Sequence, residues 1–272
     1  QVSFIGRLMP PSSTRGVALA PHPALARSLA GWREIVLALA VITVLVAAAL
    51  WWFVPDKPNA GKGAGLSEQF SGVKQIFVSR HFWRYAPLGF WLTGGFMAVQ
   101  GLWATRWMNV IEDMEPAAIA VRLTWISAAM LAGFLFMGFF ATGLVRRGIK
   151  LENVYLGAMA TAIAALAALT FFPTFGGNLL WPLLGVCFSL SNIAYSLVAQ
   201  AFPPALSGRA NTALNLLVFA GAFGLQWGFG ILVDLLQATG WTVETAYRTA
   251  FLTLLGGQIA SIAWLAVSPK RG

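Results

Sequence analysis

One uncharged stretch constrains this chain more than any other feature. Between Glu152 and Arg209 the sequence runs for 56 residues (153 to 208) without an Asp, Glu, Lys or Arg, and only the turn-like segment from Phe172 to Asn178 interrupts it. Each apolar block beside this turn has the length of a helix that crosses the ~30 Å hydrocarbon core of a bilayer. We therefore expect an all-α, polytopic membrane protein.

The composition extends this expectation to the whole chain. Of the 272 residues, 58% are hydrophobic and only 10% are charged, which is unlike a soluble domain. The net charge of +9 is carried mostly by the gaps between apolar spans, so the expected counter-charge is the lipid bilayer and not a nucleic acid. We predict about seven transmembrane helices, at 35–54, 85–105, 123–145, 154–172, 179–202, 210–233 and 249–267.

The charges of the gaps predict a topology. Gaps rich in Lys and Arg alternate with gaps that are not basic. By the positive-inside rule, the gaps at 55–84, 146–152 and 203–209 and the C-terminus are expected to be cytoplasmic. Because residues 55–84 also contain Gly, Pro and Ser, we expect a flexible basic connector there.

Residues 1–31 do not fit this scheme. They carry Arg7, Arg15 and Arg27 on the side expected to be outside, and they show neither a signal-peptide order nor a sustained periodicity. We interpret them as an irregular segment or the remnant of another helix. The front part of the protein is expected to be missing.

Several motifs resemble one family. The residues GWRE, at Gly31 to Glu34, precede an apolar span that closes with FVPDKP, at Phe53 to Pro58, and a long basic gap and six further spans follow. The segment from Ala201 to Asp234 leads from a Pro-containing basic loop into a Gly-rich span that ends in Gly-x-x-x-Asp. Together these features resemble the sixth helix, central loop and C-terminal half of a major facilitator superfamily (MFS) transporter.

The resemblance implies a domain organisation. Residues 32–54 correspond to the sixth MFS helix, 55–84 to the cytoplasmic connector, and 85–268 to the C-terminal six-helix bundle. The residues QGLWATRW, at Gln100 to Trp107, are similar to the seventh helix of bacterial members of the nitrate/nitrite or arabinose-efflux-like group, which implies a multi-pass protein of the bacterial inner membrane. Alternating access needs two bundles, so an N-terminal MFS bundle is the implied missing partner.

One motif departs from the family pattern. The family's loop Gly-x-x-x-Asp-Arg-x-Gly-Arg-Arg corresponds here to GFFATGLVRRG, at Gly138 to Gly148. Thr142 and Gly143 stand where the family has its Asp and first Arg. The electrostatic latch that the family builds from these two charges is therefore not expected in this half.

Small residues recur in the span at 210–233. Gly224, Gly228 and Gly230 have spacings that permit two helices in a membrane to approach closely. Close packing is the first interpretation, and bending of the helix is the alternative.

Candidate substrate-binding residues are polar or aromatic side chains within the spans. The central stretches of the spans contain no Asp, Glu, Lys or Arg, so amides and aromatic rings are the informative groups. Members three residues apart share a helix face, and the resemblance places their helices around a central cavity. Interhelical hydrogen bonding is the alternative role. The residues expected to contact a small-molecule or ion substrate are Gln100, Trp103, Asn192, Tyr195 and Asn215.

Enzymatic activity is not expected. His22 and His81 lie outside the spans, and the sequence contains no HExxH, Gly-x-Ser-x-Gly or phosphate-loop motif. The last span lacks the Lys that a retinal Schiff base needs. We expect no catalytic residue, no cofactor and no metal. The residues favour a partial secondary transporter of the MFS type, incomplete as given, and a self-contained seven-helix receptor or scaffold is the alternative.

Overall fold

The computed structural model describes residues 31–54, 66–173 and 175–268. The chain divides into two compact units, Gln1–Ala64 and Gly65–Gly272. The described part of the first unit is helix α2 (Trp32–Phe53), whose 22 residues extend about 33 Å, enough to cross hydrocarbon. None of its hydrophobic stretch is buried inside the structure. The span expected at 35–54 is confirmed, whereas the segment expected to be irregular lies, apart from Gly31, outside the described residues.

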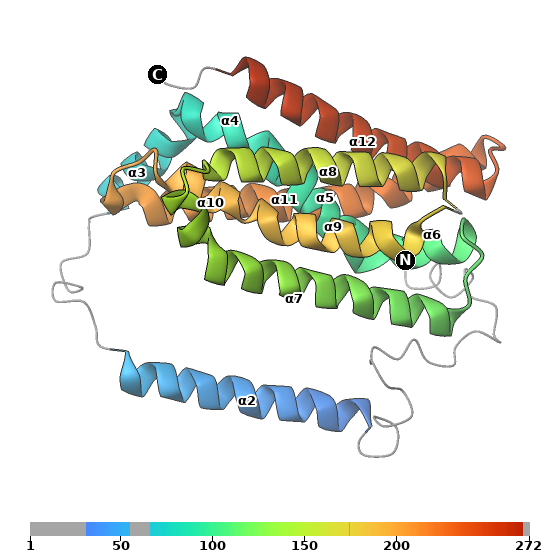
Figure 1. The fold of residues 1–272 in the computed structure, drawn as a ribbon, viewed down its shortest axis with the longest axis horizontal. Coiled ribbons are helices and arrows are strands. Elements are labelled where there is room, and N and C mark those ends of the chain that lie inside the picture. Colours follow the sequence, from blue (N-terminus) through green and yellow to red (C-terminus); the bar gives the residue numbers. More distant parts are fainter. Residues whose placement is uncertain (1–30, 55–65, 174, 269–272) are drawn as a thin grey trace. The chain divides into compact units, whose positions relative to one another are not determined.

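The second unit consists of helices joined by short turns and loops, and no strand occurs among its described residues (Figure 1). Six helices of the described chain, α2 included, are long and apolar enough to cross a membrane. The elements of the second unit are α3 (Leu66–Val78), α4 (Arg80–Leu88), η2 (Gly89–Gly94), α5 (Gly95–Ala98), η3 (Val99–Trp103), α6 (Ala104–Val110), α7 (Pro116–Arg146), α8 (Leu151–Phe171), α9 (Gly177–Ser191), α10 (Ile193–Ala199), α11 (Pro204–Ala238) and α12 (Val243–Val267).

The remaining expected span, 85–105, is an irregular helix. Elements α4 to α6 follow one another without a break from Arg80 to Val110, but η2 and η3 have π-helical hydrogen bonding. Pro87 lies inside α4 and has no N–H, so the carbonyl of Trp83 lacks its usual helical donor. The indole Nε1 of Trp264 on α12 donates to that carbonyl at 2.8 Å. The neighbouring helix therefore repairs the gap that the proline opens.

The connector expected over 55–84 is not structureless. Its second half forms α3, which packs against α11 and α4. Gly72 and Ile76 on one face of α3 are buried, and a Cβ at Gly72 would lie 3.1 Å from Leu206 of α11. The Gly and Ser content suggested a flexible linker, but here Gly72 permits close docking of a helix.

Most helices extend beyond their expected spans. Pro116 opens α7, seven residues before the expected start, in the first-turn position where a missing N–H costs nothing. Gly148 and Gly240 follow α7 and α11 with φ of 79° and 89°, and backbone bonds from Ile149 to Leu144 and from Trp241 to Leu236 close both ends at 3.1 Å. The expected spans were too short because each was ended at the nearest charged residue, whereas the helices continue past these residues.

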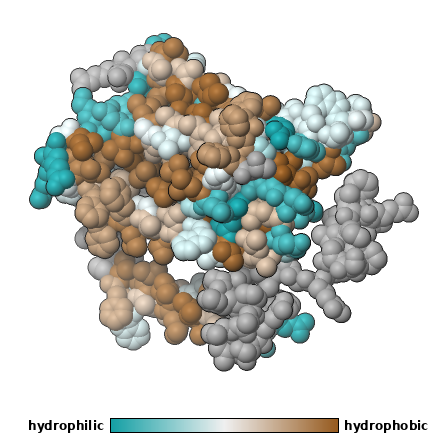
Figure 2. Space-filling view, turned by 45° about the vertical axis from the view of Figure 1, so that its right-hand side comes forward, coloured by the Kyte–Doolittle hydropathy of each residue, from teal (hydrophilic) through white to brown (hydrophobic). Residues whose placement is uncertain are grey.

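The two ends of the bundle differ in charge. The 31 residues of α7 separate them by about 46 Å. We call one the acidic end, which carries Glu112, Asp113, Glu115, Asp234 and Glu244, and the other the basic end, which carries Arg80, Arg146, Arg147, Lys150 and Arg209. Between the ends the exposed side chains are mostly apolar, Phe139, Phe223 and Trp227 among them, and hydrophobic residues dominate the coloured surface of Figure 2.

A buried ion pair joins three segments at the acidic end. Arg122 of α7 pairs with Glu112 of the preceding loop, and their side chains are 11% and 5% exposed. The Nε1 of Trp181 donates to Glu112 at 2.9 Å, and Arg122 donates to the side chain of Asn178 at 2.7 Å. Glu112 and Arg122 therefore fasten the loop after α6 to the start of α9.

A second ion pair lies at the basic end. Arg84 of α4 pairs with Glu152 of α8 at 3.0 Å. Arg84 also donates to the carbonyl of Ser268 after α12 at 2.9 Å, and the Tyr85 hydroxyl donates to Glu152 at 3.3 Å. The pair therefore connects α4, α8 and the end of α12.

Two glycines set the contact between η2 and α11. A Cβ on Gly94 would lie 2.5 Å from the carbonyl oxygen of Val218, and a Cβ on Gly221 would lie 2.9 Å from the carbonyl carbon of Phe90. Each helix thus approaches the backbone of the other. Of the glycines expected to pack, Gly224 and Gly228 would meet nothing within 4 Å and Gly230 would touch only the ring of Trp103. Gly221, one turn earlier, makes the close approach.

We expect Gly221→Ala to destabilise the bundle by about 1–3 kcal/mol, because the added methyl group meets backbone that cannot move aside. Gly224→Ala adds the same group to open space on the same helix, and we expect no loss of stability from it. Heating the detergent-solubilised variants and measuring the fraction that stays monodisperse compares them. Equal stability of the two would contradict the proposed contact.

We expect Glu112→Ala to destabilise the protein by about 3 kcal/mol or more, because it leaves the Arg122 guanidinium buried without a counter-charge. The control is Glu244→Ala. Glu244 pairs with Arg248, and their side chains are 58% and 33% exposed, respectively. Loss of this exposed pair is expected to cost under about 1 kcal/mol. The same heating assay measures both, and an Arg122→Met/Glu112→Ala double variant is expected to recover part of the loss.

Candidate functional site

The candidate site follows one face of α11. Asn215 and Gln226 are 11 residues apart, close to three full helical turns, so they lie on the same side of the helix about 16 Å from each other. Asn211 lies one turn before Asn215, and its Oδ1 is buried with no hydrogen bond to any described residue. We call these three amides the α11 stripe. It runs between α10 on one side and the α4–α6 helix on the other.

Near the basic end, α10 contributes Tyr195. Its hydroxyl donates to Oδ1 of Asn215 at 2.8 Å. The Tyr195 ring is half-buried, whereas Asn215 is exposed. Two of the five residues expected to bind substrate therefore form one polar pair, with the free amide group of Asn215 still available to a ligand.

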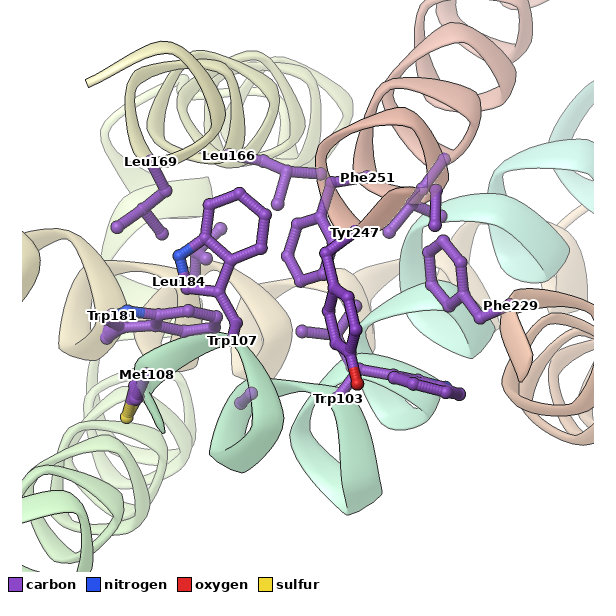
Figure 3. Close-up of a cluster of buried hydrophobic side chains, with 14 of the residues drawn as sticks. Trp103, Trp107, Met108, Leu166, Leu169, Trp181, Leu184, Phe229, Tyr247 and Phe251 are labelled. Carbon is purple, nitrogen blue, oxygen red and sulfur yellow. The ribbon is translucent and has the colours of Figure 1, made fainter. Parts of the chain in front are cut away.

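Nearer the acidic end, η3 contributes Trp103. The indole Nε1 of Trp103 donates to the backbone carbonyl of Gln226 at 3.0 Å. Its ring meets Phe229 and Tyr247 edge to face, with centroids 5.8 and 5.9 Å away, and Figure 3 shows the Tyr247 ring reaching down to Trp103. Trp103 is buried and fixed in orientation, so it forms a rigid wall at this end of the stripe.

Gln100 lies beside this wall. It is half-buried, and its side chain has no hydrogen bond to the described residues. The next residue, Gly101, lies beside the side chain of Gln226, because a Cβ there would be in ordinary contact with its Oε1 at 3.7 Å. The unpaired amide of Gln100 is thus a free donor and acceptor close to Trp103.

Asn192 behaves differently from the other four. It lies at the turn where α9 gives way to α10, and its Nδ2 donates to the carbonyls of Phe188 and Ser189 at 3.5 and 3.3 Å. No hydrogen bond of its side chain joins it to Gln100, Trp103, Tyr195 or Asn215 among the described residues. Its amide bonds to carbonyls of α9 at the break between α9 and α10. The sequence did not predict this break, because residues 179–202 form one uninterrupted apolar span.

The residues expected to bind substrate did not include Gln226, Arg106 or Asp234, which lie near Trp103 or Tyr247. The backbone carbonyl of Gln226 accepts the hydrogen bond of the Trp103 indole. Arg106 was placed beyond the span at 85–105, but α6 continues to Val110 and carries it as an exposed helical residue. Arg106 and Asp234 lie close enough to act electrostatically on the Tyr247 hydroxyl. The uninterrupted helical character of QGLWATRWMNV was the signal that the helix continues.

The groups on this face are of kinds that can hold a polar molecule. The face offers amides, a phenol, an indole wall and, at the acidic end, one guanidinium, which are groups that hold a polar molecule through hydrogen bonds and aromatic contact. The described residues contain no group of three or more His, Cys, Asp and Glu side chains placed to hold a metal ion.

The comparisons with known proteins concern the whole chain. None of the curated proteins matches it. Among solved structures, a bacterial homolog of the human lysosomal transporter Spinster, in an inward-facing and unoccupied conformation, is similar with 15% identity and a TM-score of 0.49; the similarity covers 98% of this chain and 62% of that protein. The sequence model of the Major Facilitator Superfamily matches residues 14–226, which is more than half of the chain. The chain therefore belongs to the Major Facilitator Superfamily.

Proposed function

We propose that this chain supplies the C-terminal helix bundle of a secondary transporter, which moves a small solute across a membrane by alternating access. The observation that carries the proposal is the α11 stripe, whose Asn215 pairs with Tyr195 near one end and whose Gln226 lies beside Trp103 at the other. Polar groups inside a membrane bundle need partners or water. In transporters built from repeats, such groups line the central site near the bilayer midplane.

The proposal includes a second bundle. Alternating access requires two bundles that rock about a shared site, and the exposed faces of α7 and α11 offer the surface for the second one. The bacterial inner membrane and the nitrate/nitrite or arabinose-efflux-like group are parts of the same proposal, supported by the residues QGLWATRW. Family membership does not favour the alternative of a self-contained receptor or scaffold.

We expect Asn215→Ala and Tyr195→Phe to weaken solute binding by about 2- to 10-fold each, because each removes one hydrogen bond worth about 0.5–1.5 kcal/mol. The effects should not add, since the two groups share one bond. The measurement is uptake into proteoliposomes that contain the protein with both bundles, after a solute has been identified from a panel by its thermal stabilisation of the protein.

Two further variants sharpen this test. Thr161→Ala removes an exposed hydroxyl on α8 that bonds only its own helix, at 2.8 Å from Gly157, and we expect unchanged uptake. Asn192→Ala is expected to lower stability more than binding, unless its amide turns from Phe188 toward the solute. Wild-type uptake in both Asn215→Ala and Tyr195→Phe would exclude the α11 stripe as the substrate site.

The charges of the two ends predict an orientation, with the basic end in the cytoplasm. We expect Lys150→Cys to react with an impermeant maleimide only after cells are opened, and Glu115→Cys to react in intact cells. Both substitutions are made in a Cys187→Ser background, which removes the chain's one cysteine. Glu115 is preferred over Glu112, whose side chain is buried in its ion pair. Labelling of position 150 in intact cells would reverse the topology.

A further inference from the structure

A polar side chain is buried deep inside the bundle, away from the α11 stripe. Gln258 of α12 is 5% exposed. Its Nε2 donates to the carbonyl of Trp91 on η2 at 3.4 Å, but its Oε1 has no hydrogen-bond partner among the described residues. An amide oxygen without a donor is costly in an apolar interior. A partner outside the described side chains would remove this cost.

Gln258 is one of the residues that line a small cavity. The volume of the cavity is about 30 Å³, and residues of η2, α5, η3, α8, α9 and α12 line it. Its lining is apolar except at Gln258, Ser191 and the thiol of Cys187. Of these, Gln258 and Ser191 are the groups that form strong hydrogen bonds.

The Ser191 hydroxyl has one acceptor position left. It donates its proton to the carbonyl of Phe188 at 2.6 Å and accepts from the hydroxyl of Thr93 at 3.1 Å. A hydroxyl oxygen has two lone pairs, so one remains. The cavity therefore presents two acceptors, Gln258 Oε1 and Ser191 Oγ, and no spare strong donor.

We propose that this cavity is a binding site for one internal water molecule, which donates one proton to Gln258 Oε1 and the other to Ser191 Oγ. Water is a neutral ligand of this size with two donors. A single-hydroxyl ligand would leave one acceptor unsatisfied, and an ammonium ion would bring an unpaired charge into the core. The volume exceeds the ~10–15 Å³ that one water requires, and two polar partners meet the lower limit for a buried water.

The position of the water gives it a structural role. It connects α12 to α9 beside η2, which departs from α-helical hydrogen bonding. Buried waters commonly satisfy polar groups that secondary structure leaves open. This water would extend the contacts of Gln258 from η2 to α9, and the site does not depend on the proposed transport function.

Radiolytic labelling of the full chain in detergent tests the site. Hydroxyl radicals generated from a bound water oxidise the sulfur side chains beside it. Met159 lines the cavity and is 1% exposed, whereas Met108 is 0% exposed and lies outside the lining. We expect Met159 to oxidise about tenfold faster than Met108, because only Met159 has a water next to it. Equal rates would overturn the proposal.

Two variants assign the water to its partners. Gln258→Leu removes one acceptor and fills space, and Ser191→Ala removes the other while leaving Gln258 in place. In each variant that remains monodisperse, oxidation of Met159 is expected to fall to the rate of Met108. Oxidation of Met159 that persists unchanged in such a variant would show that bulk solvent reaches the cavity and would also overturn the proposal.

Discussion

The need to pair every backbone N–H and C=O inside hydrocarbon governs this structure. In the α4–α6 helix this pairing is irregular, because Pro87 has no N–H and two π-helical segments depart from α-helical hydrogen bonding. Three side chains of α12, spaced three residues apart, donate to backbone carbonyls of this helix: Gln258 to Trp91, Ser261 to Pro87 and Trp264 to Trp83. The acceptors are four residues apart and follow in the opposite chain direction to the donors. One face of α12 therefore hydrogen-bonds along one side of the irregular helix.

The α4–α6 helix makes different kinds of contact on two of its sides. One side is held to α12 by hydrogen bonds and to α8 and α12 by the ion pair of Arg84. Another side meets α11 through glycine contacts, where Gly94 and Gly221 bring the two backbones together. Trp103 can therefore be fixed against the carbonyl of Gln226, because the spacing between the helices is already set by small residues and not by the indole itself.

Charge patterning alone predicted the all-α fold and the apolar helices, since a long uncharged stretch has few other solutions. It misplaced helix ends because Arg122 and Arg84 are buried in ion pairs, and a sequence does not show which charges are paired. It missed α3 because a glycine such as Gly72 is typical of a linker. In the structure Gly72 instead lets α3 pack closely against α11. Of the candidate site, Tyr195 and Trp103 each bond to a residue of α11, Tyr195 to Asn215 and Trp103 to Gln226. The local bonds of Asn192 and the carbonyl of Gln226 depend on turns and backbone positions that residue types do not encode.

Under the proposed function, the chemistry of the α11 stripe and its neighbours bears on which solutes this bundle can bind. Asn215, Tyr195 and Gln100 are neutral, so they can orient a polar molecule through hydrogen bonds but bring no charge of their own. Arg106 supplies a positive charge near the acidic end, where Asp234 is also exposed. In the proposed transporter, an anionic solute would find a positive group on this face at Arg106, whereas a neutral polar solute could be held by the stripe, Gln100 and the Trp103 wall.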